Sequence, residues 1–397
     1  MKDSFTVISA PSGRDNGLLS LTESRSRYML PFGGKFRVVD FTLRNSSAME
    51  AAYTILYTDV DDSLDNYIAG RNFLEDESVA HLVRVVNSTD IHDFIKVIDE
   101  TDTSHYIIYN GDNPSIIDFR QLTDRFIKKG GDAVLYLIEI DGKATMANKI
   151  LIVKRKPLIK SLKKAVKENA HAPNIVEMVV NMVINLGIRR EIYKTFYWPV
   201  NNIPEYYRIT GNIIWNPNIL TLLYKDRIIK SRIAPPESGY AMLGKTADVT
   251  NSFMSDFCHI EGKVENSVIY PGVTVDEKAV VKDSILLPFA HIGRGAKVVR
   301  SIVDETTEAQ DAPNIGSYCN VGTYEEHLRN GDFPHSIFGS LTLIGKNCRI
   351  PERITIGGAC YIASNVNEAS FEKTRTVNNG VSVYAQALQE QDPKTED

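Results

Sequence analysis

The sequence predicts an α/β domain with a mostly parallel sheet, followed by a parallel β-helix built from hexapeptides. Two observations predict this fold class. Short apolar runs alternate with amphipathic segments in the N-terminal part, and aliphatic residues recur every six positions in the C-terminal part. A period of six fits neither an α-helix nor simple strand alternation, whereas a short strand and a corner, repeated, produce it.

Composition and charge exclude several classes of protein. The chain has 397 residues, 43% hydrophobic and 24% charged, which suits two globular domains and not a disordered chain. Its net charge of −5 provides no overall positive potential that would attract nucleic acid. No apolar run approaches the roughly 18 residues of a membrane helix. Residues 1–12 lack the pattern of a secretory signal, so we expect a cytoplasmic protein without a membrane partner.

The N-terminal elements follow from apolar runs and helical spacing. We expect strands at Phe5–Ala10, Tyr106–Tyr109 and Ala133–Ile140, helices at Ile91–Asp99 and Phe119–Lys129, and short helical or strand pieces at Val38–Leu43 and Ala52–Thr58. Parallel sheets bind ligands at the carboxyl ends of their strands. The turn after the first strand and the sequence Asn110-Gly111-Asp112 are therefore the candidate sites.

Two exact runs carry the period of six in the C-terminal part. They are Ile269, Val275, Val281 and Leu287, and then Ile344, Ile350, Ile356 and Ile362. Between them the stretch Thr306–Ser340 loses the period, and we expect it to lie outside the stack. A β-sandwich with coincidental spacing is the other interpretation. The predicted boundaries are an α/β domain at 1–230, a linker at 231–248, a β-helix at 249–370 and an extension at 371–397.

The four cysteines lie in the C-terminal part without metal-ligand spacing. They are Cys258, Cys319, Cys348 and Cys360, and no two of them form a Cys-x-x-Cys pair. Such spacing in a chain without a secretory signal favours free buried thiols over disulfides or a metal site.

A long specific string identifies a family resemblance. Residues Pro31–Phe41 read Pro-Phe-Gly-Gly-Lys-Phe-Arg-Val-Val-Asp-Phe. Further pieces follow in the same order: Gly111-Asp112, Tyr197-Trp198, Pro235-Pro236, Ser284–Pro288 and Ile292–Arg294. Together they resemble the ADP-glucose pyrophosphorylase (glucose-1-phosphate adenylyltransferase) family, from about Phe5 to Val366.

This resemblance implies a Rossmann-like nucleotidyltransferase domain followed by a left-handed parallel β-helix of hexapeptide repeats. Enzymes of the family join ATP and glucose 1-phosphate into ADP-glucose and pyrophosphate, for glycogen or starch synthesis. Nucleotidyl transfer needs backbone N–H groups, a cationic side chain and Mg²⁺ held by carboxylates, because negative charge is spread over the reacting phosphorus centre.

The nucleotide-binding loop departs from the family pattern. The family's Gly-Gly-x-Gly-Thr-Arg-Leu loop matches residues 12–18, which read Ser-Gly-Arg-Asp-Asn-Gly-Leu. Ser12 and Asp15 replace glycines around the retained Gly13, and Gly17 replaces the catalytic arginine. Losing such a cation costs roughly 10³–10⁵ in rate. Arg14 is out of register, so we expect a degraded loop and no intact catalytic residue.

The implied metal site and sugar-phosphate motif are also incomplete. Asp112 matches one of the family's two metal-binding aspartates, although a plain turn residue is the other interpretation. The second aspartate belongs in Tyr197–Ile203, which reads Tyr-Trp-Pro-Val-Asn-Asn-Ile. A single carboxylate holds Mg²⁺ weakly, so we expect this cofactor only if the protein is active. The family's Phe-x-Glu-Lys-Pro motif is absent between Asp132 and Val153.

Three arginines match basic positions that contact anionic regulators in the family. Arg25, Arg27 and Arg37 flank the Pro-Phe-Gly-Gly string, and arginine can hold phosphate bidentately. We therefore expect a site for a sugar-phosphate or nucleotide effector, with ordinary ion pairs as the other interpretation.

The damaged motifs predict a non-catalytic or weakly active regulatory subunit of ADP-glucose synthesis. We expect it to work in a homo- or hetero-tetramer with a catalytic pyrophosphorylase subunit. Two alternatives stay open. One is an active, divergent sugar-1-phosphate nucleotidyltransferase that makes ADP-glucose, and the other is a binding or scaffold protein unrelated to glycogen.

Overall fold

The computed structural model describes residues 3–11, 16–58, 64–69, 83–88, 90–167, 175–184, 188–225, 239–306 and 313–385. Contacts divide the chain into two compact units, residues 1–201 with 218–232, and residues 202–217 with 233–397. Within the described ranges, no helix is long and apolar enough to cross a membrane.

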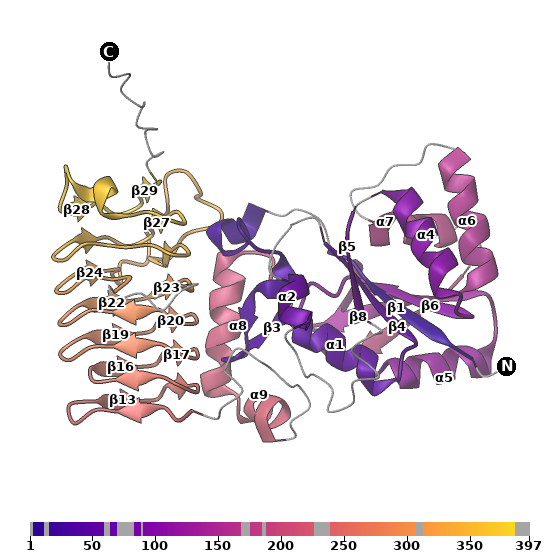
Figure 1. Cartoon of the computed structure of the whole chain (residues 1–397), viewed down its shortest axis with the longest axis horizontal. Helices are drawn as coiled ribbons and strands as arrows, with labels where there is room; N and C mark the ends of the chain where they lie inside the picture. Colours follow the sequence, from indigo (N-terminus) through magenta and orange to yellow (C-terminus); the bar gives the residue numbers. More distant parts are fainter. Residues whose placement is uncertain are drawn as a thin grey trace, which may run out of the picture. The chain divides into compact units, whose positions relative to one another are not determined.

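A seven-stranded sheet forms the N-terminal unit, in the order β10-β8-β9-β6-β1-β4-β5 (Figure 1). Its strands are β1 (Phe5–Ser9), β4 (Tyr53–Thr58), β5 (Val83–Asn87), β6 (His105–Tyr109), β8 (Ala133–Ile140), β9 (Lys143–Lys154) and β10 (Arg189–Lys194). All neighbours are parallel except those of β9, which runs antiparallel to β6 and β8. The predicted mostly parallel sheet is confirmed, and β9 is a strand that the prediction did not contain.

Helices cover both faces of this sheet. They are α1 (Val38–Ala48), α4 (Ile91–Thr101), α5 (Phe119–Lys129), α6 (Arg155–Lys167) and α7 (Ile175–Ile184), with the short α2 (Leu64–Ala69) after β4. Side chains on alternate strand positions face opposite sides. Ile8 and Ile108 pack with α4, α6 and α7, whereas Val7 and Ile107 pack with α5.

The string that carries the family resemblance folds as a hairpin and the start of a helix. Strand β2 (Pro31–Phe32) pairs with β3 (Phe36–Arg37), and α1 begins at the next residue. Gly33 and Gly34 make the turn with φ of 67° and 86°, a region that favours glycine. The rings of Phe32, Phe36 and Phe41 are almost fully buried. Most residues of this string therefore build the fold, as a turn or as part of an aromatic core.

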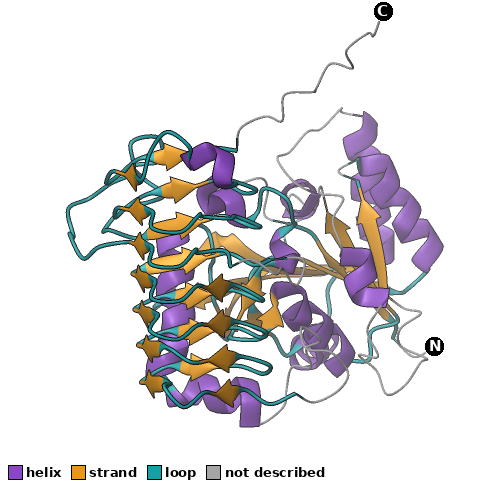
Figure 2. Cartoon of the chain, turned by 60° about the vertical axis from the view of Figure 1, so that its left-hand side comes forward, coloured by secondary structure: helices purple, strands orange, loops and turns teal. Residues whose placement is uncertain are grey.

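The second unit is a parallel β-helix (Figure 2). One of its sheets stacks seven strands: β13 (Asp248–Thr250), β16 (Lys263–Glu265), β19 (Val280–Lys282), β22 (Lys297–Val299), β24 (Asn320–Val321), β26 (Thr355–Ile356) and β28 (Thr376–Val377). A second also has seven: β14 (Phe253–Met254), β17 (Val268–Ile269), β20 (Ile285–Leu286), β23 (Ser301–Val303), β25 (Thr342–Ile344), β27 (Tyr361–Ile362) and β29 (Ser382–Val383). The third has four: β12 (Met242–Leu243), β15 (His259–Ile260), β18 (Thr274–Val275) and β21 (His291–Ile292).

The period of six marks the inward positions of these coils. All eight residues of the two exact runs are at most 1% exposed. Each coil leaves an apolar face that the next coil covers, so burial requires stacking. The expectation that Thr306–Ser340 lies outside the stack is wrong in part. Ile315 bridges to Ile292 and Ile350, and β24 belongs to the first sheet, so this stretch supplies a coil before its loop departs.

Serine hydroxyls complete the hydrogen bonding at one corner. The backbone N–H of Ser267 donates to Ser252 Oγ at 3.1 Å, and that of Ser284 donates to Ser267 Oγ at 3.1 Å. Ser301 continues the ladder onto Ser284 Oγ at 3.2 Å. A small hydroxyl therefore satisfies a backbone donor where the chain turns and the strand ladder is interrupted.

The ends of the β-helix differ from the predicted boundaries. Helix α8 (Ile203–Trp215) groups with the β-helix and packs against β17 and β20. The Tyr207 hydroxyl on this helix donates to Asp283 O at 2.5 Å. Strands β28 and β29 extend the stack into the predicted extension at 371–397. The first part of the predicted linker, residues 231–238, lies outside the described residues, and its second part contains β12.

All four cysteines are free and buried in the β-helix, as the sequence predicts. Burial raises the pKa of Cys258 and of Cys348 to about 12, and it also raises the pKa of Cys319 and Cys360. The thiolate is the reactive form. We therefore expect no reaction with a thiol-specific disulfide reagent at pH 8 in the native protein, and reaction of all four thiols in urea. Rapid labelling of any thiol before unfolding would contradict this burial.

Candidate functional site

Asp112 lies at the carboxyl end of the central strands, where the sequence analysis placed it. It follows β6, which pairs with β1 in the middle of the sheet. Its side chain is 0% exposed. A buried carboxylate needs a cation or hydrogen-bond donors, because an isolated charge is costly to remove from water.

Gly111 fixes the approach of Asp112 to the neighbouring elements. A Cβ at this position would lie 2.1 Å from Ser9 Oγ and 2.8 Å from Thr42 Oγ1, so only glycine fits without movement. The Gly111 carbonyl accepts a hydrogen bond from Thr42 Oγ1 at 2.9 Å. The turn is therefore packed directly against β1 and α1.

A buried arginine pairs with Asp112. Arg27 lies in a short 3-10 helix (Arg27–Met29), and its Nη1 is 3.4 Å from Asp112 Oδ2, with only 8% of the Arg27 side chain exposed. The Arg27 guanidinium also donates from Nη2 to Val200 O, and Nη2 lies 3.4 Å from both Asn113 Oδ1 and Asn201 Oδ1. The chain's own cation thus balances the candidate metal ligand.

The segment expected to carry the second aspartate supplies neutral groups instead. Strand β11 (Phe196–Tyr197) pairs with β7 (Ser115–Ile116), which places the segment beside the Asp112 turn. Val200 N donates to Asn113 Oδ1 at 2.8 Å. Burial, and then the negative charge of Asp112, raise the pKa of the Tyr197 hydroxyl, which keeps this group protonated.

These groups do not fit a divalent cation. A hard cation takes several oxygen ligands and prefers carboxylates. Here one carboxylate faces a guanidinium 3.4 Å away, and the nearby oxygens of Val200 and Asn201 already accept from, or face, the same guanidinium. No set of three or more His, Cys, Asp or Glu side chains in the described part of the chain is arranged to hold a metal.

The other two arginines also bind their own chain. Arg25 is 2% exposed, and its Nε donates to Leu21 O at 2.6 Å. Arg37 donates from Nη1 to Met29 O, and its guanidinium lies 5.6 Å from the centre of the Tyr67 ring. Arg25 and Arg27 are buried, and the contacts described here are all with groups of the protein itself. An effector site at the three arginines therefore stays a prediction.

Most of the candidate nucleotide loop lies outside the described residues. Ser12, Gly13, Arg14 and Asp15 fall there, whereas Gly17 is described within a 3-10 helix (Asn16–Leu21). Gly17, which the resemblance places at the family's catalytic arginine, is half-buried, and the loop's geometry stays a prediction.

Sequence reasoning did not predict that Arg27 contacts Asp112. The two residues belong to separate predicted sites, one for an effector and one for a metal. No local pattern links them, because they are 85 positions apart in the sequence. Asn113 and the Val200 carbonyl were likewise unassigned, although they complete the surroundings of the Arg27 guanidinium.

Comparison with known proteins gives matches to both parts of the chain. The glucose-1-phosphate adenylyltransferase of Bacillus cytotoxicus is 23% identical over 365 residues, which cover 81% of this chain and 96% of that protein. The enzyme of the same name from Bacillus anthracis is 23% identical over 368 residues, with the same coverage. Residues 237–322 match the GlmU-like C-terminal hexapeptide family. The chain is thus similar along most of its length to glucose-1-phosphate adenylyltransferases, which confirms the resemblance to the ADP-glucose pyrophosphorylase family that its sequence indicates.

Proposed function

We propose that this protein is a non-catalytic, regulatory-type subunit of an ADP-glucose-forming pyrophosphorylase. The observation that carries the proposal is the pair between Arg27 and Asp112. A fixed guanidinium beside the one retained carboxylate leaves no place for a divalent cation that would bridge substrate phosphates. The glycine at position 17 supports the same conclusion, because it removes a cation that the transition state needs.

A subunit of this kind acts through a catalytic partner. The proposal places it in the cytoplasm, in a hetero-tetramer that includes a catalytic pyrophosphorylase chain. An anionic sugar phosphate or nucleotide would modulate the assembly, and Mg²⁺ would be held by the catalytic chain. The preserved fold supports this role, because an assembly partner must keep its shape while its reaction centre is free to change.

Co-expression with the catalytic paralogue of the same organism tests the proposal. We expect the two chains to co-elute in size-exclusion chromatography, and we expect the mixed assembly to respond differently to fructose bisphosphate or AMP than the catalytic chain alone. As a control, the catalytic chain is purified with and without later addition of this protein. Separate elution, with an unchanged effector response, would contradict the proposal.

An active, divergent transferase is the second candidate. The alignment supports it because it spans 96% of proteins that carry the enzyme's name, including the region around Asp112. This alternative predicts Mg²⁺-dependent turnover by the chain alone, lost in Asp112→Asn. The two candidates therefore differ in an assay that needs no partner.

A further inference from the structure

Helix α6 presents five exposed lysines on its outer face. They are Lys156, Lys160, Lys163, Lys164 and Lys167, called here the lysine face. Four of them follow the spacing i, i+4, i+7 and i+11, which forms one stripe about 16 Å long at 1.5 Å per residue. The opposite side of α6, with Leu158 and Leu162, is buried in the core.

The stripe differs from other lysines of the same unit. All members of the lysine face except Lys164 lack a carboxylate within ion-pair distance among the described residues. By contrast, Lys129 Nζ is 2.9 Å from Glu191 Oε1. Lys194 Nζ is likewise 2.7 Å from Glu139 Oε1. Helix α6 also contains no acidic residue, and like charges at i+3 and i+4 weaken a helix. Repulsion among these lysines therefore lowers the stability of helix α6.

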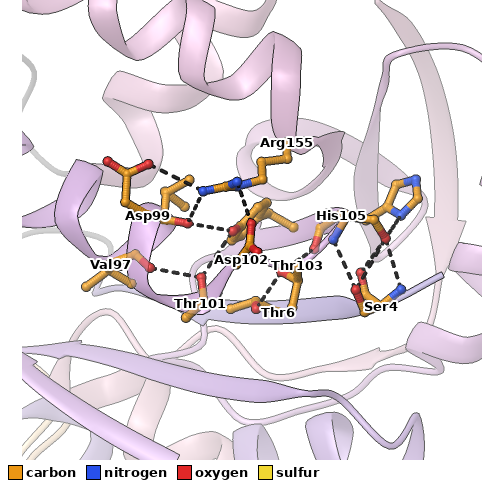
Figure 3. Close-up of polar contacts among 12 residues, drawn as sticks. Ser4, Thr6, Val97, Asp99, Thr101, Asp102, Thr103, His105 and Arg155 are labelled. Carbon is orange, nitrogen blue, oxygen red and sulfur yellow. Dashed lines mark hydrogen bonds and ion pairs between the residues drawn. The ribbon is translucent and has the colours of Figure 1, made fainter. Parts of the chain in front are cut away.

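The helix is held in place at its first residue (Figure 3). Arg155 Nη1 is 2.6 Å from Asp102 Oδ1, and Nη2 is 3.4 Å from Asp99 Oδ1. These carboxylates lie at the end of α4 and balance Arg155, so the net positive charge of α6 is confined to the outward lysines. An anchored stripe loses little freedom on binding, which favours affinity.

Two hollows line the lysine face. One, of about 520 Å³, lies beside Lys156, Lys160 and Arg189, and the other, of about 630 Å³, extends along the helix to Lys167. The first hollow also contains Asp132, whose carboxylate pairs with Lys154 at 3.5 Å. They share Lys156 and Lys160. The positive surface is therefore a continuous hollowed strip, longer than a single phosphate group.

We propose that the lysine face binds a chain of phosphate groups, with inorganic polyphosphate as its ligand. Lysine acts on phosphate as a point charge without fixed geometry, which suits a flexible and repetitive anion. Among the described residues that line the two hollows there is no aromatic side chain on which a base could stack and no amide that could recognise one. The apolar side of α6 is buried in the core, so it cannot insert into a membrane.

Binding of labelled long-chain polyphosphate, followed by fluorescence anisotropy at several salt concentrations, tests this inference. The variant Lys160→Gln/Lys163→Gln/Lys167→Gln removes three charges of the stripe. We expect it to weaken binding about 100-fold, since each lysine near a dense anionic surface contributes about fivefold. The slope of log affinity against log salt should fall by about 2, because each phosphate contact adds about 0.7.

The control variant Lys96→Gln/Lys129→Gln/Lys194→Gln changes the net charge equally but alters lysines that are paired with carboxylates. We expect it to bind polyphosphate almost as tightly as the natural chain. Equal losses in both variants, or no binding by the natural chain, would overturn the proposal. Tighter binding to duplex DNA or to phosphatidylserine vesicles than to polyphosphate would overturn the choice of ligand. None of these results depends on the proposed regulatory role, because no pyrophosphorylase activity is measured.

Discussion

Replacing Arg27 by Met is expected to lower the free energy of unfolding of the N-terminal unit by about 3–5 kcal/mol, because it removes a cation that pairs with the buried Asp112 carboxylate. Urea unfolding followed by tryptophan fluorescence in a Trp215→Phe background measures this, since the remaining Trp198 ring packs on Phe32 and Phe41 in the same unit. The double variant Arg27→Met/Asp112→Asn should recover much of the loss, because the uncompensated charge is gone.

The matched control for this substitution is Arg120→Met. Arg120 pairs with Glu50 at 3.2 Å, but both side chains are more than half exposed. An exposed pair contributes about 0–1 kcal/mol, so we expect little change. Similar effects of the two substitutions would show that the Arg27–Asp112 pair is not the buried structural pair described above.

Replacing Gly322 by Ala is expected to destabilise the β-helix by about 2–5 kcal/mol. The backbone has φ of 84°, where an L side chain costs about 1–2 kcal/mol, and overpacking adds about 1–3 kcal/mol. A Cβ would lie 1.9 Å from the Val299 carbonyl oxygen of the preceding coil, which cannot move without breaking the stack. Thermal unfolding of the purified chain measures the change.

Gly142→Ala separates backbone strain from the clash. Gly142 has φ of 76°, yet a Cβ there meets no described atom within 4 Å. This variant should show only the conformational cost of about 1–2 kcal/mol. Equal losses at Gly142 and Gly322 would mean that the close approach of the coils does not limit the stability of the stack.

The fold was predictable in the C-terminal part, where a single sequence period of six determines which side chains are buried. The exact runs of six identify inward residues because a β-helix places one aliphatic side chain per flat face. Ile315 and Val321 also stand six apart, so they were a usable signal for the missed coil. Strand β9 was harder to predict because its pairing with β6 and β8 depends on contacts between distant parts of the chain.

The candidate site was predictable in its position but not in its interactions. Asp112 followed from its place after an apolar strand and from the family resemblance. Its contact with Arg27 joins residues from a 3-10 helix and a strand end, and no local pattern encodes that distance. The Pro31–Phe41 string illustrates the difference: most of its residues form a hairpin, an aromatic core and a helix start, so local packing alone accounts for them.

A turnover assay of the purified chain tests the central claim most directly. ATP, glucose 1-phosphate and Mg²⁺ are supplied without a partner, and both ADP-glucose formation and the reverse pyrophosphorolysis are measured. We predict no turnover above the rate of a blank without protein, in either direction. Rapid ADP-glucose formation that disappears in Asp112→Asn would contradict the account, because it would mean that the carboxylate paired with Arg27 still serves catalysis.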